Sequence, residues 1–141
     1  MTTEAGLALP ELVIDVTPTF VIASAIATRD FQDVHHDRDK AVARGSKDIF
    51  INILTTTGLV QRYVTDWAGP QALVRKVAIR LGVPCYAGDT LTFSGRVEED
   101  PGGGDNDGEC LVEVVGRCSL GDHVTGTVRV VLPDGRAGGA A

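Results

Sequence analysis

Three segments in the second half of the chain alternate apolar and polar residues with a period of two, and this pattern limits the folds that the chain can adopt. Successive side chains of a β-strand point to opposite faces, so each segment places its apolar residues on one face. The segments are 76–81, 90–98 and 124–132, and a fourth, 109–118, has the same β-branched character. We therefore predict antiparallel strands that share one covered face.

Residues 46–67 have the spacing of a helix instead. Apolar residues recur there every three or four positions, which predicts one long helix with a wide buried stripe. A short helix is expected over 40–44, because an acidic residue (Asp37 or Asp39) stands near its start and Gly45 follows its end.

The runs 12–16 and 20–25 resemble two further short strands. A single long helix and a sheet with one apolar face combine most simply when the sheet wraps around the helix. The sequence therefore predicts an α+β architecture of the hotdog type.

The chain has 141 residues, which is the length of one domain. We expect a flexible N-terminus over 1–9, a single hotdog domain over 10–133 and a flexible C-terminal tail over 134–141. The Gly- and Asp-rich connection 100–108 contains no apolar side chain to bury, and this favours a flexible hairpin loop.

Composition excludes several classes of function. A formal net charge of −6 argues against a nucleic-acid surface, since such surfaces neutralise phosphates with Lys and Arg. No apolar run is long enough to cross a membrane, and the N-terminus lacks the pattern of a secretory signal. Cys85, Cys110 and Cys118 are odd in number and lack Cys-x-x-Cys spacing, which is typical of reduced, structural thiols in a cytoplasmic protein.

The densest group of chemically active side chains lies in the polar stretch 28–39, which contains Asp30, His35 and His36. Such a run can be a solvated loop with a helix N-cap, or it can supply zinc or iron ligands. Adjacent histidines tend to point apart, and no distant His-Asp pair completes a coordination shell, so we predict no metal site. The third histidine, His123, lies at a predicted turn and is interpreted as a loop residue.

The segment 27–37, Ala-Thr-Arg-Asp-Phe-Gln-Asp-Val-His-His-Asp, resembles the signature of the MaoC-like, R-specific enoyl-CoA hydratases. In that family an Asp and a His lie five positions apart, as Asp30 and His35 do here. Residues 80–91 are similar to the family's Arg-Phe-x-x-Pro-x-x-x-Gly-Asp-x-Leu pattern, so the resemblance spans roughly residues 18–133. Further similarity in 45–50 and 59–70 is to one branch, the small catalytic subunits of actinobacterial steroid side-chain hydratases.

The resemblance implies addition of water to the double bond of a 2-enoyl-CoA, with a steroid side-chain acyl group. It also implies a second MaoC-like hotdog subunit, in a 2:2 heterotetramer. No cofactor is expected, because coenzyme A is part of the substrate. The alternatives are a hotdog acyl-CoA thioesterase and a non-catalytic subunit that completes a partner's pocket.

Hydration needs a base for the water proton, an acid for the α-carbon and donors for the charge on the thioester oxygen. We assign Asp30 and His35 jointly to water activation and proton delivery. The oxyanion donors are expected among the backbone amides at the start of the long helix, from Ser46, Lys47, Asp48 and Ile49, although Lys47-Asp48-Ile49 stands where the family usually has Ala-His-Gly. The coenzyme A phosphates could be bound by Arg75, Lys76 and Arg80. The alternative is that these residues only form a solvated face of a strand.

Overall fold

A five-stranded antiparallel sheet curves around one long helix. The structure is a computed structural model, and it describes residues 5–99 and 108–132. The elements in chain order are β1 (Ala8–Val16), α1 (Pro18–Ala27), a 3-10 turn η1 (Asp33–His35), α2 (Arg38–Ala43), α3 (Ile53–Ala68), β2 (Leu73–Leu81), β3 (Asp89–Glu98), β4 (Glu109–Cys118) and β5 (Gly121–Val131).

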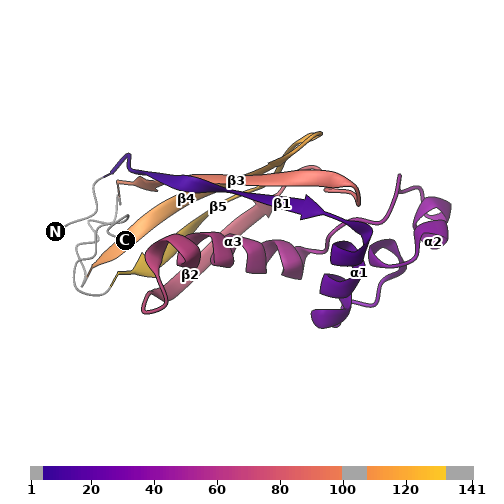
Figure 1. The fold of residues 1–141 in the computed structure, drawn as a ribbon, viewed down its shortest axis with the longest axis horizontal. Helices are drawn as coiled ribbons and strands as arrows, with labels where there is room; N and C mark the ends of the chain where they lie inside the picture. Colours follow the sequence, from indigo (N-terminus) through magenta and orange to yellow (C-terminus); the bar gives the residue numbers. More distant parts are fainter. Residues whose placement is uncertain (1–4, 100–107, 133–141) are drawn as a thin grey trace.

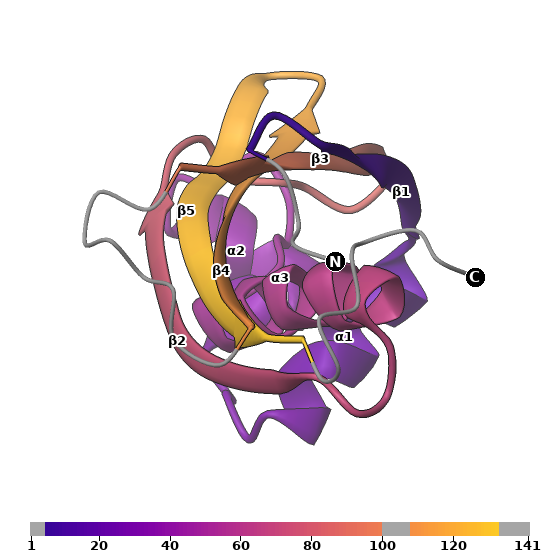
Figure 2. The same cartoon turned by 90° about the vertical axis from the view of Figure 1, so that its left-hand side faces the viewer.

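The strand order is β1-β3-β4-β5-β2, with every neighbouring pair antiparallel. Helix α3 runs along the concave face of the sheet, while α1, η1 and α2 gather at one end of the molecule (Figure 1). Viewed along α3, the sheet surrounds the helix from β1 round to β2 (Figure 2). The predicted α+β hotdog fold is confirmed.

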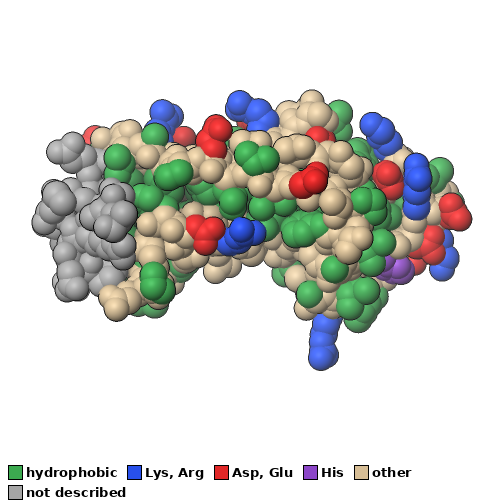
Figure 3. Space-filling view, in the orientation of Figure 1, with side chains coloured by type: hydrophobic (Ala, Val, Ile, Leu, Met, Phe, Trp, Pro, Cys, Tyr) green, Lys and Arg blue, Asp and Glu red, His purple; other side chains and the backbone are tan. Residues whose placement is uncertain are grey.

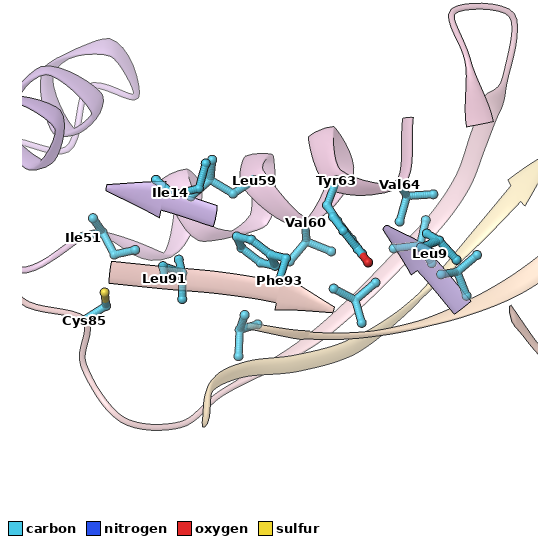
Figure 4. Packing of buried hydrophobic residues seen from close by; sticks show 14 of the residues in the cluster. Leu9, Ile14, Ile51, Leu59, Val60, Tyr63, Val64, Cys85, Leu91 and Phe93 are labelled. Carbon is cyan, nitrogen blue, oxygen red and sulfur yellow. The ribbon is translucent and has the colours of Figure 1, made fainter. Parts of the chain in front are cut away.

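The core lies between α3 and the sheet. Leu91 and Phe93 on β3 are fully buried, as are Val60 and Val64 on α3. The ring of Tyr63 stacks on Phe93 with centroids 5.8 Å apart (Figure 4). Burying each side chain of this size contributes about 1.5–3 kcal/mol. This packing holds α3 although the Thr-Thr-Thr-Gly run in its first two turns has poor helix propensity.

The predicted strand over 20–25 is wrong, because these residues belong to helix α1. Thr17 caps this helix by accepting a hydrogen bond from Phe20 N at 3.0 Å, and Pro18 occupies its first position. A short apolar run does not distinguish strand from helix by periodicity, whereas Thr followed by Pro is a helix start signal.

The long helix begins at Ile53 and not at Ser46. The residues before it pair with a second extended segment: Ile51 N donates to Cys85 O at 3.2 Å, and Ala87 N donates to Ile49 O at 3.0 Å. Because these bonds join residues far apart in sequence, the local apolar spacing contains no sign of them.

The chain ends differ in part from the expectation. Strand β1 begins at Ala8 and Leu9 is only 5% exposed, so the expectation of flexibility is wrong for these two residues of the segment 1–9. The expected tail 134–141 and most of the loop 100–108 lie outside the described residues. Over 5–99 and 108–132, no helix combines the length and apolar character that crossing a membrane requires.

Candidate active site

The turn that ends α1 places Asp30. Arg29 has a φ of 57° and is the one non-glycine residue with positive φ in the described part of the chain. Arg29 N donates to Ile26 O at 3.0 Å and Asp30 N donates to Ala25 O at 2.9 Å, which is the hydrogen-bond pattern of a Schellman motif. A left-handed conformation costs a non-glycine residue roughly 1–2 kcal/mol, so the backbone is strained directly beside the candidate carboxylate.

His35 is held with a defined tautomer. Its Nδ1 lies 2.8 Å from Phe50 O, and because a carbonyl only accepts hydrogen bonds, Nδ1 carries a proton. In the neutral ring Nε2 then carries the lone pair. Nε2 lies 3.5 Å from Asp30 Oδ2, and the side chains of His35 and Asp30 are 8% and 17% exposed. The structure therefore brings together a basic nitrogen and a carboxylate oxygen in a nearly closed site.

A third side chain, which the sequence analysis missed, completes this cluster. The amide of Asn52 donates to Asp30 Oδ2 at 3.1 Å and to Thr28 Oγ1 at 2.8 Å. Gln32 N donates to the other carboxylate oxygen, Oδ1, at 3.3 Å. One local signal in the sequence could have identified Asn52. Asn is a common N-cap residue, and here it directly precedes the apolar run that forms α3.

The first turn of α3 offers backbone donors beside this cluster. Asn52 Oδ1 accepts from Thr55 N, and Asn52 O accepts from Thr56 N, both at 3.1 Å. The amides of Ile53 and Leu54 occupy the first two helical positions, where no intrahelical acceptor exists. The positive end of the helix dipole also lies at this turn, so an anion is favoured there.

The expected oxyanion donors Ser46, Lys47, Asp48 and Ile49 do not lie at the start of the long helix. Ser46 N donates to Ala41 O at 3.0 Å, and Ile49 N donates to Asp48 Oδ1 at 2.7 Å. Two of the four amides therefore already have acceptors, one in α2 and one in the loop itself. The prediction that these residues open the helix is wrong because 49–51 pair with the segment 85–87.

The three basic candidates on β2 are all exposed, but they occupy different positions along the strand. Arg80 lies near the end that joins the first turn of α3 through His123, since Gly82 N donates to His123 O and His123 contacts Thr56. Arg75 is five residues further along β2, about 16 Å away at the rise of a strand. Lys76 lies next to Arg75.

His123 is a buried residue and not the loop residue that the sequence suggested. It is 3% exposed; its Nδ1 donates to Val83 O at 2.7 Å and its Nε2 accepts from Thr56 Oγ1 at 2.8 Å. Burial lowers the pKa of His123, and the hydrogen bond to Val83 O opposes this in part. The ring therefore acts as a neutral link between β5, α3 and the segment after β2.

Cys85, Asp89 and Cys118 bring potential metal-ligand atoms within 4.8 Å of one another. However, the Asp89 carboxylate already accepts from Ser119 Oγ and Thr90 N, both at 2.7 Å. Burial, the largest cause, raises the pKa of the Cys85 thiol to about 12, which disfavours the thiolate that a metal binds. We interpret the group as a hydrogen-bonded cluster that closes this end of the sheet.

Charged side chains and a histidine gather on the surface at the end of the molecule that carries α1 and α2 (Figure 3). A recess of about 320 Å³ opens there, lined by Phe31, Gln32, Asp33, Val34 and Arg44. It lies along the loop that joins Asp30 to His35, and its lining includes neither of these two residues.

Comparison with known proteins gives one curated relative of high similarity. The 3-oxo-4,17-pregnadiene-20-carboxyl-CoA hydratase beta subunit of Mycobacterium tuberculosis is 64% identical over 132 residues, which are 94% of this chain and 98% of the relative. No family model matches the sequence.

Solved structures agree with this relation. A chain of the ChsH1-ChsH2 complex from Mycobacterium tuberculosis superposes with a TM-score of 0.87 and 63% identity, covering 93% of this chain and 99% of that one. The (R)-hydratase from A. caviae involved in PHA biosynthesis has a TM-score of 0.82 at 19% identity, covering 92% and 97%. At that identity the second likeness supports the fold alone.

Proposed function

The chain belongs to the MaoC-like enoyl-CoA hydratases, and on that basis we propose that it is the catalytic subunit of a heteromeric hydratase for a steroid side-chain enoyl-CoA. The observation that supports the catalytic role best is the pair formed by His35 Nε2 and Asp30 Oδ2, 3.5 Å apart and nearly closed off from solvent. The steroid substrate and the second subunit are inferred from the name of the mycobacterial relative and from the complex in which a similar chain was solved.

In the proposed mechanism, Asp30 and His35 hold one water molecule between them. The water oxygen adds to the β-carbon of the enoyl thioester while one of its protons passes to the pair. A proton from the pair is delivered to the α-carbon, so the site regains its starting protonation state and no net proton is consumed. Imidazole suits this exchange because it gains and loses protons near neutral pH.

Negative charge builds on the thioester oxygen as the water adds. We assign its stabilisation to the amides of Ile53 and Leu54, in place of the four amides expected from the sequence, because these two point out of the helix without an intrahelical acceptor. Arg80 is the candidate nearest this turn for a coenzyme A phosphate.

The reaction as proposed uses no metal and no cofactor, since protons and hydrogen-bond donors suffice for hydration. Dialysis of the active complex against a chelator should leave the rate unchanged. Loss of activity that one divalent ion restores would contradict this. We also propose a cytoplasmic location, because the number and spacing of the three cysteines are typical of reduced thiols.

The test is hydration by the chain co-expressed with its MaoC-like partner, assayed on the pregnadiene carboxyl-CoA and on a short-chain enoyl-CoA. Asp30→Asn and His35→Ala should each lower turnover by about 10²–10⁴-fold, the range for a positioned acid or base. His36→Ala is the matched control, because His36 is the adjacent histidine and its ring contacts only Phe31 O among the described bonds. It should retain activity.

Near-normal turnover in either Asp30→Asn or His35→Ala would remove that residue from the mechanism. If both variants match the wild type, the chain is a supporting subunit and the partner carries the chemistry. Release of free coenzyme A in place of a hydrated thioester would instead indicate a thioesterase.

A further inference from the structure

Asn52 uses every hydrogen-bonding group of its side chain and is 2% exposed. Its two amide hydrogens go to Thr28 Oγ1 at 2.8 Å and Asp30 Oδ2 at 3.1 Å. Its carbonyl oxygen Oδ1 accepts from Thr55 N at 3.1 Å as the N-cap of α3. One side chain thus joins the end of α1, the candidate carboxylate and the start of the long helix.

We propose that Asn52 is a positioning residue, which holds the Asp30 carboxylate in its reactive orientation and in a fixed relation to the first turn of α3. This inference rests on the proposed hydration and names a further residue for it. Asn52 acts through Asp30 and does not itself touch the reacting atoms.

Asn52 holds the carboxylate oxygen of Asp30 that faces His35. Asp30 Oδ2 accepts from Asn52 and is also the oxygen that faces His35 Nε2 at 3.5 Å. A donor on this oxygen restricts rotation of the carboxylate and so fixes the direction in which Oδ2 faces His35. The Gln32 amide on Oδ1 holds the other side at 3.3 Å.

Asn52 also connects the two groups of residues that the proposed reaction needs, the proton-transfer pair and the oxyanion donors. The proton-transfer pair is placed by α1 and η1, whereas the amides of Ile53 and Leu54 belong to α3. Asn52 precedes Ile53 in the sequence and donates a hydrogen bond to Asp30. Its side-chain amide therefore fixes the position of Asp30 relative to the first turn of α3. Small errors in such spacing are costly to a reaction that needs both groups at once.

The sharpest variant is Asn52→Asp. Asp and Asn are equally good N-caps, so the bond to Thr55 N is retained. A carboxylate cannot donate to Asp30, and it places a like charge beside it. We expect turnover at neutral pH to fall by about tenfold or more. The acid limb of the kcat/KM profile should move to higher pH by about one unit or more.

Asn52→Ser is the second variant, since Ser also caps helices but is too short to reach Asp30. It should lower kcat with little change in KM, because the coenzyme A contacts remain. Asn52→Ala, which loses both the cap and the donor, serves as a reference for the effect of helix destabilisation. Each variant is assayed in the assembled complex, with thermal unfolding recorded in parallel.

A purely structural role predicts a different result. In that case Asn52→Asp and Asn52→Ser would match the wild type in kcat and pH profile, and only Asn52→Ala would be impaired. Such a result, with Asp30→Asn inactive, would overturn the inference and leave the proposed function standing. A wild-type complex without hydratase activity would instead overturn the proposed function.

Discussion

Asp30 is oriented mainly by backbone geometry. The Schellman turn at Arg29 sets the direction of the chain, and the Asp30 amide is itself bonded to Ala25 O at 2.9 Å. The side chain is then held from two sides, by Gln32 N and Asn52 Nδ2. A strained residue beside a carboxylate that is fixed in this way is typical of sites where geometry matters more than local stability.

At the same scale, the three basic residues of β2 should differ in their effect on the substrate. Arg80→Gln should raise KM for the acyl-CoA about two- to fivefold without changing kcat, as expected for an exposed charge that meets a phosphate. Arg75→Gln is the matched control, about 16 Å along the strand, and should leave KM unchanged. Steady-state kinetics at low ionic strength measure both. Equal effects of the two variants would argue for a general charge effect and against a phosphate contact at Arg80.

Among the elements, α3 connects the site to the rest of the fold. Its first turn is capped by Asn52 on one side and tied to β5 by the bond between Thr56 Oγ1 and His123 Nε2 at 2.8 Å. Thr56 is a weak helix former, but its hydroxyl supplies a polar contact that Ala or Leu at this position would lack. Stability of α3 and geometry of the site depend on the same few residues.

The buried His123 predicts a pH dependence of stability. Its pKa is lowered in the folded state, chiefly by burial, whereas an unfolded chain has the ordinary value near 6.5. Below that value the unfolded state takes up a proton that the folded state resists. The contribution of His123 to the free energy of unfolding should therefore be complete above about pH 6.5. It should decrease as the pH falls below that value.

Urea unfolding between pH 8 and pH 5 tests this, with His123→Asn as the comparison. The variant loses the titrating ring, so its unfolding free energy should depend less on pH across this range, although its stability at pH 8 should be lower. If wild type and variant lose stability in parallel, His123 is not the group responsible.

For the molecule as a whole, β2 is the least covered part of the sheet. No residue of β2 is buried, and Leu73 and Leu81 are 53% and 43% exposed, whereas β3, β4 and β5 each contain several buried residues. β2 is also an edge strand, with backbone groups open to pairing. An exposed apolar edge of this kind is usually covered by another chain.

We therefore expect a homodimer or aggregate when the chain is expressed alone, and a stable 2:2 assembly when its MaoC-like partner is present. Size-exclusion chromatography with light scattering measures both, alongside hydration assays. Leu81→Glu should weaken assembly, whereas Val13→Lys, at a 60% exposed apolar position on the opposite edge strand β1, should not. Full steroid enoyl-CoA hydration by the isolated chain would contradict the need for a partner.

Sequence alone determined those features that depend on local pattern. Period-two alternation located β2, β3 and β5, because neighbouring residues of a strand lie on opposite faces, and β-branched character located β4. The short helix expected over 40–44, with Asp37 or Asp39 near its start, is α2 at Arg38–Ala43, and Asp37 is its N-cap. The spacing of Asp30 and His35 identified two residues that the fold brings together at 3.5 Å, while their catalytic role stays a prediction.

The helical state of 20–25 has a local signal, Thr17 followed by Pro18, that the apolar run obscured. Only the tertiary structure decided the start of α3 and the positions of Asn52 and His123. Each depends on hydrogen bonds between distant residues: 49–51 with 85–87, Asn52 with Asp30 across 22 positions, and His123 with Thr56 across 67. Apolar spacing reports which face of a segment is buried. This spacing does not indicate which distant backbone or side-chain group bonds to a buried polar atom. Those long-range hydrogen bonds position the residues of the candidate site.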